Sequence, residues 1–175
     1  MDQQAPAMSS SSPRDSNCGI AHALDAFGDQ WSLLIIRDAF FGLRRFSDFQ
    51  RNLGIARNIL SDRLQRLVEH GILQRVDAGA SGTRFEYRLS EKGEDLLPVL
   101  TALREWSDRW VAGEGQEALI ITERASGERV PRLRILSAAG RELKSADLQS
   151  RPGPGADAAM LRLFEFAARA GSQRE

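Results

Sequence analysis

The sequence predicts a mainly α-helical protein with a small amount of β structure. Apolar residues recur at helical spacing over much of residues 20–110, which predicts several helices. One of these, over 57–70, keeps its leucines on one stripe and its polar side chains on the opposite face. Two runs at 72–76 and 83–88, separated by the glycine-containing segment 77–82, predict a hairpin. Helices followed by a hairpin in this order indicate a winged helix-turn-helix.

The chain of 175 residues is 42% apolar, enough to bury one core and to carry an appendage. Residues 1–17 are polar and rich in serine, so we expect a disordered tail. Residues 18–111 hold the predicted winged helix-turn-helix and dimerisation domain, and 112–175 form a C-terminal extension. We expect a cytoplasmic protein with no membrane contact, because no apolar run has the length of a membrane span and no secretory signal is visible.

Three helices are predicted before the polar-faced one. The first is amphipathic and ends at Gly28, and the second, over 31–41, is apolar enough to belong to the core. The segment Ser47-Asp48-Phe49-Gln50 has the form of a capping box, in which the serine hydroxyl and Gln50 each satisfy a free backbone N–H. A short third helix is therefore expected to begin near Ser47.

The fourth helix has the composition of a DNA-recognition helix. Its leucines at 60, 64 and 67 fall within about 60° of one another, so the other side is exposed. Amide, hydroxyl and guanidinium groups on that side read base edges and hold phosphates. The expected DNA-binding residues are Ser47, Arg57, Asn58, Ser61, Arg63, Arg66, Thr83 and Arg84. Asp62 either accepts from a cytosine amine or pairs with Arg66, and we expect the second.

Local charge favours the same interpretation. Residues 44–88 contain nine arginines, no lysine and five acidic residues, whereas the whole chain has 24 basic and 24 acidic residues. A neutral protein with one basic segment can bind DNA, because phosphate contacts are needed only where the surface meets the duplex. The alternative is compositional bias, since 22 of the 24 basic residues are arginine throughout the chain.

A fifth helix is predicted after the hairpin, with Ser90 as its N-cap and Pro98 bending or breaking it. Its leucine and tryptophan stripe is longer than one small domain needs to cover. We interpret the stripe as a dimer interface shared with the first helix. The interface residues are Ile20, Leu24, Phe27, Leu96, Leu100, Leu103, Trp106 and Trp110. The alternative is that residues 116–170 fold back and cover the stripe.

The C-terminal extension, residues 112–175, has a different pattern of predicted elements from the domain before it. Runs at 118–122 and 130–136 predict a second hairpin, residues 152–155 form a linker, and Asp157 is positioned to cap a last helix. This segment could cover the core, extend the dimer or hold an effector, and we expect the first. No cofactor or metal is expected, because Cys18 and the two histidines are too few and too scattered for a zinc site.

Several spaced motifs resemble a known family. They are CGIAHAL at 18–24, GDQWSLLIIRD at 28–38, RFSDF at 45–49, GIARNILSDRL at 54–64, GIL at 71–73, YRLSEKG at 87–93 and PVL at 98–100 followed by Trp106. In this order they resemble the HxlR-type transcriptional regulators, within the wider MarR-like winged-helix group, over about residues 18–110. The resemblance implies a homodimer on inverted-repeat operators, with the 57–70 helix in the major groove and the 77–84 wing on flanking DNA.

Cys18, the single cysteine, has two interpretations. Its lack of a partner excludes an intrachain disulfide. Members of the family use a cysteine near this position to sense oxidants or electrophiles, and His22 on the same helical face could stabilise a thiolate. The alternative is a small apolar residue packed at the start of a helix. Sensing by Cys18 would require an intersubunit disulfide or a mixed adduct.

Three classes of function follow from these patterns. The leading one is a DNA-binding transcriptional regulator, a repressor in the simplest arrangement, with a small-molecule or oxidant effector left open. The alternative is a winged helix that binds proteins, which would not need several arginines on one surface. An enzyme is not expected, because no phosphate-binding glycine loop, metal set or Ser-His-Asp arrangement is present.

Overall fold

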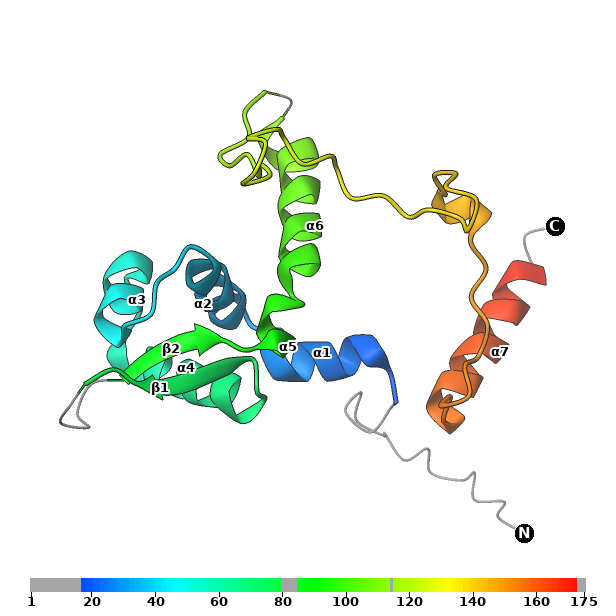
Figure 1. Cartoon of the computed structure of the whole chain (residues 1–175). Helices are drawn as coiled ribbons and strands as arrows, with labels where there is room; N and C mark the ends of the chain where they lie inside the picture. The colour runs from blue at the N-terminus through cyan, green and yellow to red at the C-terminus, as the bar shows by residue number, and fades with distance from the viewer. Residues whose placement is uncertain (1–16, 80–84, 114, 173–175) are drawn as a thin grey trace, which may run out of the picture. The chain divides into compact units, whose positions relative to one another are not determined.

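A computed structural model of the chain describes residues 17–79, 85–113 and 115–172 (Figure 1). It divides into two units, of which the larger spans Asp29–Leu148 and the smaller combines the two ends of the chain. The larger unit contains α2 (Gln30–Phe40), α3 (Phe46–Leu53), α4 (Arg57–Glu69), β1 (Leu73–Asp77), β2 (Phe85–Leu89), α5 (Glu91–Glu94), α6 (Leu97–Ser107), the π-helical turn η2 (Asp108–Ala112) and the 3-10 turn η3 (Ser145–Asp147). The smaller unit contains α1 (Gly19–Phe27) and α7 (Ala158–Ser172).

The hydrophobic core of the larger unit lies between α2, α3, α4 and the start of the hairpin. Its buried apolar residues are Ile35, Ile36, Phe49, Ile55, Leu60, Leu64, Leu67, Ile72 and Leu73. The three leucines of α4 are fully buried, which confirms the stripe expected from their spacing. Burying large aliphatic side chains contributes roughly 1.5–3 kcal/mol each, so this stripe fixes which face of α4 points outward.

Two features position α3 relative to its neighbours α4 and α2. Gly54 ends α3 at a φ of 61°, a left-handed conformation that glycine adopts without strain. Asp38 of α2 is buried and accepts hydrogen bonds from Arg37 (2.9 and 2.7 Å) and from Asn52 of α3 (2.7 Å). The buried carboxylate therefore joins α2 to the end of α3.

The capping box expected at Ser47 is wrong. The N-cap of α3 is Arg45, which has no side-chain capping bond, and Ser47 already lies in the first turn of the helix. The Ser47 hydroxyl is 3.4 Å from the Asp48 carboxylate instead. The reason is tertiary, because the Tyr87 N–H donates to the Arg44 carbonyl at 2.8 Å and holds the preceding loop against β2.

β1 and β2 form an antiparallel hairpin (Figure 1). Leu73 pairs with Leu89 and Asp77 with Phe85. Gly71 precedes the hairpin at a φ of 68°, so the chain reverses after α4 and the Ile72 N–H donates to the Leu67 carbonyl at 2.9 Å. The hairpin is confirmed, with strands one or two residues later than predicted. Residues 80–84 of the segment joining the strands, which include Thr83 and Arg84, lie outside the described residues.

The chain after the hairpin behaves as predicted at two positions. The Ser90 hydroxyl accepts from the Gly93 N–H at 3.0 Å and caps α5. Helical structure is interrupted between α5 and α6, and Pro98 occupies the first turn of α6, where its missing N–H costs no helical bond. The expected break at proline is therefore confirmed.

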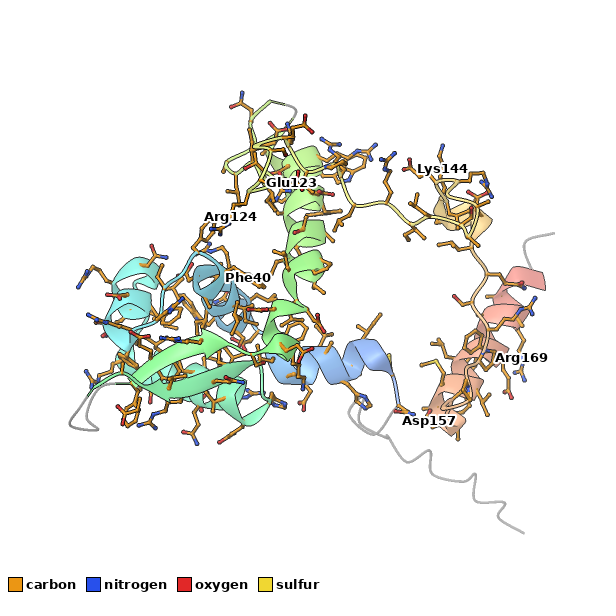
Figure 2. The ribbon with its side chains drawn as sticks, viewed as in Figure 1. Phe40, Glu123, Arg124, Lys144, Asp157 and Arg169 are labelled. Atoms are coloured by element: carbon orange, nitrogen blue, oxygen red, sulfur yellow. The ribbon has the colours of Figure 1, made fainter. Side chains whose placement is uncertain are left out.

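The hairpin predicted in the extension is largely absent. It is reduced to a single bridge between Thr122 and Arg129, and the run after it bridges Leu136 to Glu142. The next ladder bond would join the Arg132 N–H to the Leu119 carbonyl, but that carbonyl accepts from Arg104 of α6 at 3.2 Å instead. The last helix is confirmed, since Asp157 accepts from the Met160 N–H at 2.8 Å at the start of α7 (Figure 2).

Candidate nucleic-acid interface

The exposed face of α4 carries the groups expected to read DNA. Because Leu60, Leu64 and Leu67 point into the core, the side chains of Arg57, Asn58 and Ser61 are exposed in the first half of the helix. Further along the same helix, the Gln65 amide donates to the Glu69 carboxylate at 2.8 Å. The turns of α4 nearest its N-terminus thus present a guanidinium, an amide and a hydroxyl to solvent.

Arg57 is positioned by an aromatic ring from the preceding helix. Its guanidinium lies 5.3 Å from the centroid of Phe46, the first residue of α3. A cation over an aromatic face is attracted by the ring quadrupole and still has its N–H groups available at the edge. The contact restricts where the exposed guanidinium can go and places it beside the N-terminus of α3.

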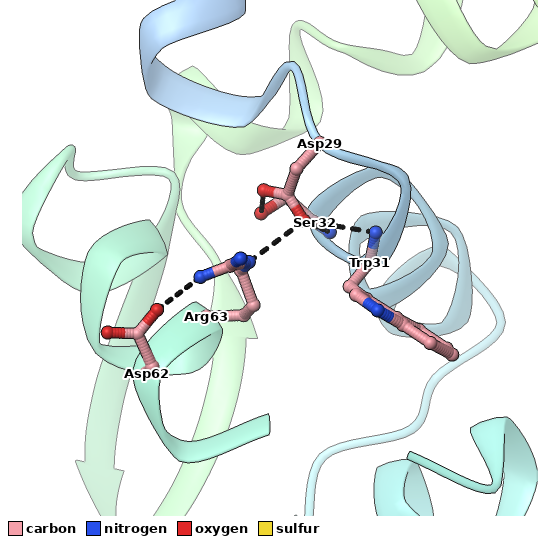
Figure 3. Close-up of polar contacts among 5 residues, drawn as sticks. All are labelled: Asp29, Trp31, Ser32, Asp62 and Arg63. Carbon is pink, nitrogen blue, oxygen red and sulfur yellow. Dashed lines mark hydrogen bonds and ion pairs between the residues drawn. The ribbon is translucent and has the colours of Figure 1, made fainter. Parts of the chain in front are cut away.

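Arg63 has a different environment from Arg57. Its Nε donates to Asp29 Oδ1 at 2.9 Å, its Nη1 pairs with Asp62, and only 23% of its side chain is exposed (Figure 3). The sequence predicted Arg66 as the partner of Asp62, and the structure pairs Asp62 with Arg63. The geometry makes Arg63 a residue that positions α4 against α2, and its contact with phosphate stays a prediction.

Asp29 is the centre of this network, as Figure 3 shows. It caps α2 by accepting from the Trp31 and Ser32 N–H groups at 3.1 Å each, and from the Ser32 hydroxyl at 2.5 Å. Partial burial pushes the pKa of Asp29 upward. The hydrogen bonds from Ser32 and Arg63, with the charge of Arg63, outweigh that effect and hold the pKa below its ordinary 3.8. The carboxylate is therefore charged at neutral pH and ties α2 to α4.

The remaining predicted DNA-binding residues lie in varied positions. Ser47 is exposed in the first turn of α3, and Arg66 is half-buried in the last turn of α4. The structure brings Arg57, Asn58 and Ser61 together at one end of α4. It gives no placement for the two wing residues at 83 and 84.

Other arginines near α4 were not singled out from the sequence. On the hairpin, the Arg75 guanidinium lies 3.5 Å from the centroid of the Phe85 ring, and Arg88 pairs with Glu86 at 2.9 Å. Arg44 and Arg45 are exposed in the loop before α3. These arginines were counted in the net charge of residues 44–88, but only the fold shows which arginines share a surface.

The stripe interpreted as a dimer interface is open in the larger unit. Trp106 and Trp110 are 61% and 64% exposed, Leu103 is also exposed, and Leu96 and Leu100 are half-buried. The extension attaches to another side of α6, where Arg104 donates to the Leu119 carbonyl and Glu105 accepts from the Leu133 N–H. The described part of the extension that belongs to this unit, up to Leu148, therefore leaves Leu103, Trp106 and Trp110 exposed.

In the smaller unit, Ile20 is 72% exposed, Leu24 is also exposed and Phe27 is half-buried. Cys18 is a half-buried free thiol at the N-cap of α1, and its carbonyl accepts from the His22 N–H at 3.0 Å. That contact belongs to the main chain, so redox sensing by Cys18 stays a prediction.

Among the described residues, no group of three His, Cys, Asp or Glu side chains is placed to hold a metal ion. Of the helices that the structure describes, none has the length and apolar character needed to cross a bilayer.

Comparison with known proteins agrees with this geometry. An uncharacterized HTH-type transcriptional regulator of Mycobacterium tuberculosis, Rv3095, is 39% identical over 150 residues, which cover 85% of this chain and 94% of the relative. A Synechocystis protein of the same description, sll1512, is 33% identical over 106 residues, covering 60% and 78% of the two chains.

Solved structures are similar over most of the chain. The proposed transcription factor PA1607 matches with a TM-score of 0.74 and 43% identity, over 82% of this chain and all of that one. The proposed transcription factor PA1374 of Pseudomonas aeruginosa matches with a TM-score of 0.58 and 40% identity, over 83% and 99% of the two chains. A family model described as HxlR-like helix-turn-helix matches residues 26–115. The fold is therefore a winged helix-turn-helix, and the chain belongs to the HxlR-like helix-turn-helix family of transcriptional regulators.

Proposed function

We propose that this protein regulates transcription by binding a specific DNA operator as a homodimer, with α4 in the major groove. The observation that carries the proposal is the exposed N-terminal half of α4, where Arg57, Asn58 and Ser61 lie side by side above a buried leucine stripe. Arginine recognises guanine and asparagine recognises adenine by paired hydrogen bonds in the major groove. The residues at the start of a recognition helix come closest to those base edges.

The dimer is supported by the uncovered stripe on α6 and η2. Exposing a row of tryptophan and leucine side chains to water is energetically unfavourable. A second molecule of the same chain would bury them in a symmetric interface. A dimer with two recognition helices reads two half-sites of an inverted repeat. Occupation of such an operator near a promoter blocks polymerase, so repression is the simplest outcome, with the hairpin contacting DNA beside each half-site.

The proposal is tested by fluorescence anisotropy of the purified chain on DNA from its own upstream region, against scrambled duplex, over a series of salt concentrations. Selective and salt-sensitive binding is expected. Arg57→Gln should weaken binding to the selected site by about 1–3 kcal/mol and reduce discrimination against scrambled DNA. Arg124→Gln is the matched control, because Arg124 is an exposed arginine in the extension (Figure 2).

Two outcomes would contradict the proposal. If neither the upstream duplex nor sites selected from genomic fragments bind better than scrambled DNA, the winged helix would instead act as a protein-binding module. If selective binding occurs but Arg57→Gln and Arg124→Gln behave alike, α4 does not read the operator through Arg57.

A further inference from the structure

An ion pair on β2 lies beside a loop that carries two further arginines, and all three arginines come from segments other than α4. On β2, Arg88 Nη2 donates to Glu86 Oε2 at 2.9 Å, which places both side chains on the same face of the strand. Arg44 and Arg45 lie in the loop that Tyr87 holds against β2 through its N–H. We call Arg44, Arg45 and Arg88, together with Glu86, the arginine cluster.

The charges of the arginine cluster do not balance. Glu86 has only 16% of its side chain exposed, whereas Arg88 is 48% exposed and both loop arginines are exposed. The hydrogen bond from Arg88 is the main cause that lowers the pKa of Glu86, and the charges of Arg88, Arg44 and Arg45 add to it. The cluster has one carboxylate and three arginines, of which only Arg88 is hydrogen-bonded to Glu86, so two positive charges stay available to an outside anion.

The arginine cluster is continuous with the proposed recognition surface. Arg45 is the N-cap of α3, and the next residue, Phe46, supports the Arg57 guanidinium of α4. In helix-turn-helix complexes the first helix of the pair crosses the DNA backbone while the second enters the groove. The arginine cluster therefore lies where that architecture meets phosphates, and guanidinium groups bind phosphate through paired hydrogen bonds.

We propose that the arginine cluster binds backbone phosphates of DNA, and that Glu86 is a built-in counter-charge that limits affinity for DNA of any sequence. The inference rests on the proposed function, because α4 must first place the duplex against this surface. Glu86 holds Arg88 in position on β2 in the free protein. When the backbone arrives, its phosphate shares the guanidinium groups with Glu86 and is partly repelled by that carboxylate.

The test uses the full chain, a labelled duplex of arbitrary sequence and anisotropy over a salt series. Arg88→Gln and Arg44→Gln should each weaken binding about fivefold to tenfold at 0.1 M salt and lower the salt slope by about 0.9. Glu86→Gln should strengthen binding by a similar factor. Arg134→Gln is the control, because Arg134 is an exposed arginine of the extension. Thermal midpoints matching the wild type show that each variant is folded.

A duplex carrying the selected operator separates this inference from the proposed function. Arg88→Gln should reduce affinity for operator and arbitrary DNA equally, whereas Arg57→Gln should reduce the ratio between them. If only Arg57→Gln has an effect and the cluster variants keep the wild-type slope, the arginine cluster is not a phosphate site, and the proposed function stands. If Glu86→Gln fails to strengthen binding, the counter-charge role is wrong. If the wild-type chain binds no duplex at low salt, both fail.

Discussion

Arg63 of α4 and Asp29 at the start of α2 form an ion pair, with 2.9 Å between Nε and Oδ1, across 34 positions of the sequence (Figure 3). The same carboxylate caps α2 through the Trp31 and Ser32 N–H groups. One side chain therefore starts a core helix and fixes the orientation of the proposed recognition helix. This relationship explains why an arginine on the polar face of α4 is only partly available to DNA.

Asp29→Ala should lower the free energy of unfolding by about 1–2 kcal/mol, because it removes both the N-cap and the partner of Arg63. Urea unfolding of the single variants and of the double variant with Arg63→Ala measures the coupling between the two side chains. We expect a coupling of about 0.5–1 kcal/mol for this partly exposed pair. Strictly additive effects would show that the ion pair contributes nothing.

The contribution of the Asp29 charge should depend on pH. Its pKa is lower in the folded chain than the ordinary 3.8, so the stabilisation is fully present above the unfolded value and is lost as pH falls through the folded value. Asparagine is an equally good N-cap but does not titrate. The stability gap between wild type and Asp29→Asn should therefore be constant near neutral pH and shrink below about pH 4. A gap that keeps its size in acid would contradict the assigned pKa.

The sequence predicted what local patterns determine. The leucine stripe of α4, the end of that helix near residue 70 and the Ser90 cap depend on residues close together in the chain, and the structure has all three. The capping box at Ser47 was an equally clear local pattern. It failed because Tyr87, distant in sequence, holds the loop before α3 and moves the helix start to Phe46.

The candidate site was predictable only in part, for the same reason. Arg57, Asn58 and Ser61 could be placed on one face by helical periodicity alone. The partner of Arg63 and the surroundings of Glu86 come from other elements, and periodicity contains no information about them. Charge counting detected that arginines are concentrated in this part of the chain, but not which of them are already paired.

Gly93→Ala should destabilise the larger unit. A Cβ at Gly93 would lie 2.2 Å from the Ile72 carbonyl oxygen and 3.0 Å from a Leu89 methyl group, so α5 could not keep its place against the hairpin. A loss of about 1–3 kcal/mol is expected from such overpacking. Gly153→Ala is the control, because nothing lies within 4 Å of its added Cβ. Equal urea midpoints for both variants would show that the close approach is relieved cheaply.

Trp106→Glu should convert the proposed dimer to a monomer. Trp106 is 61% exposed in the single chain, so the substitution costs the isolated chain little, whereas a symmetric interface would bury two new carboxylates without partners. Sedimentation velocity should give about twice the 19.4 kDa chain mass for the wild type and the single mass for the variant. Phe41→Glu is the control, because Phe41 is a comparably exposed aromatic residue at the C-cap of α2 and does not belong to α6 or η2. Operator binding should weaken when dimerisation is lost, since one recognition helix alone reads half of an inverted repeat. A wild-type chain that sediments as a monomer, or a Trp106→Glu chain that stays dimeric, would show that this stripe is not the interface.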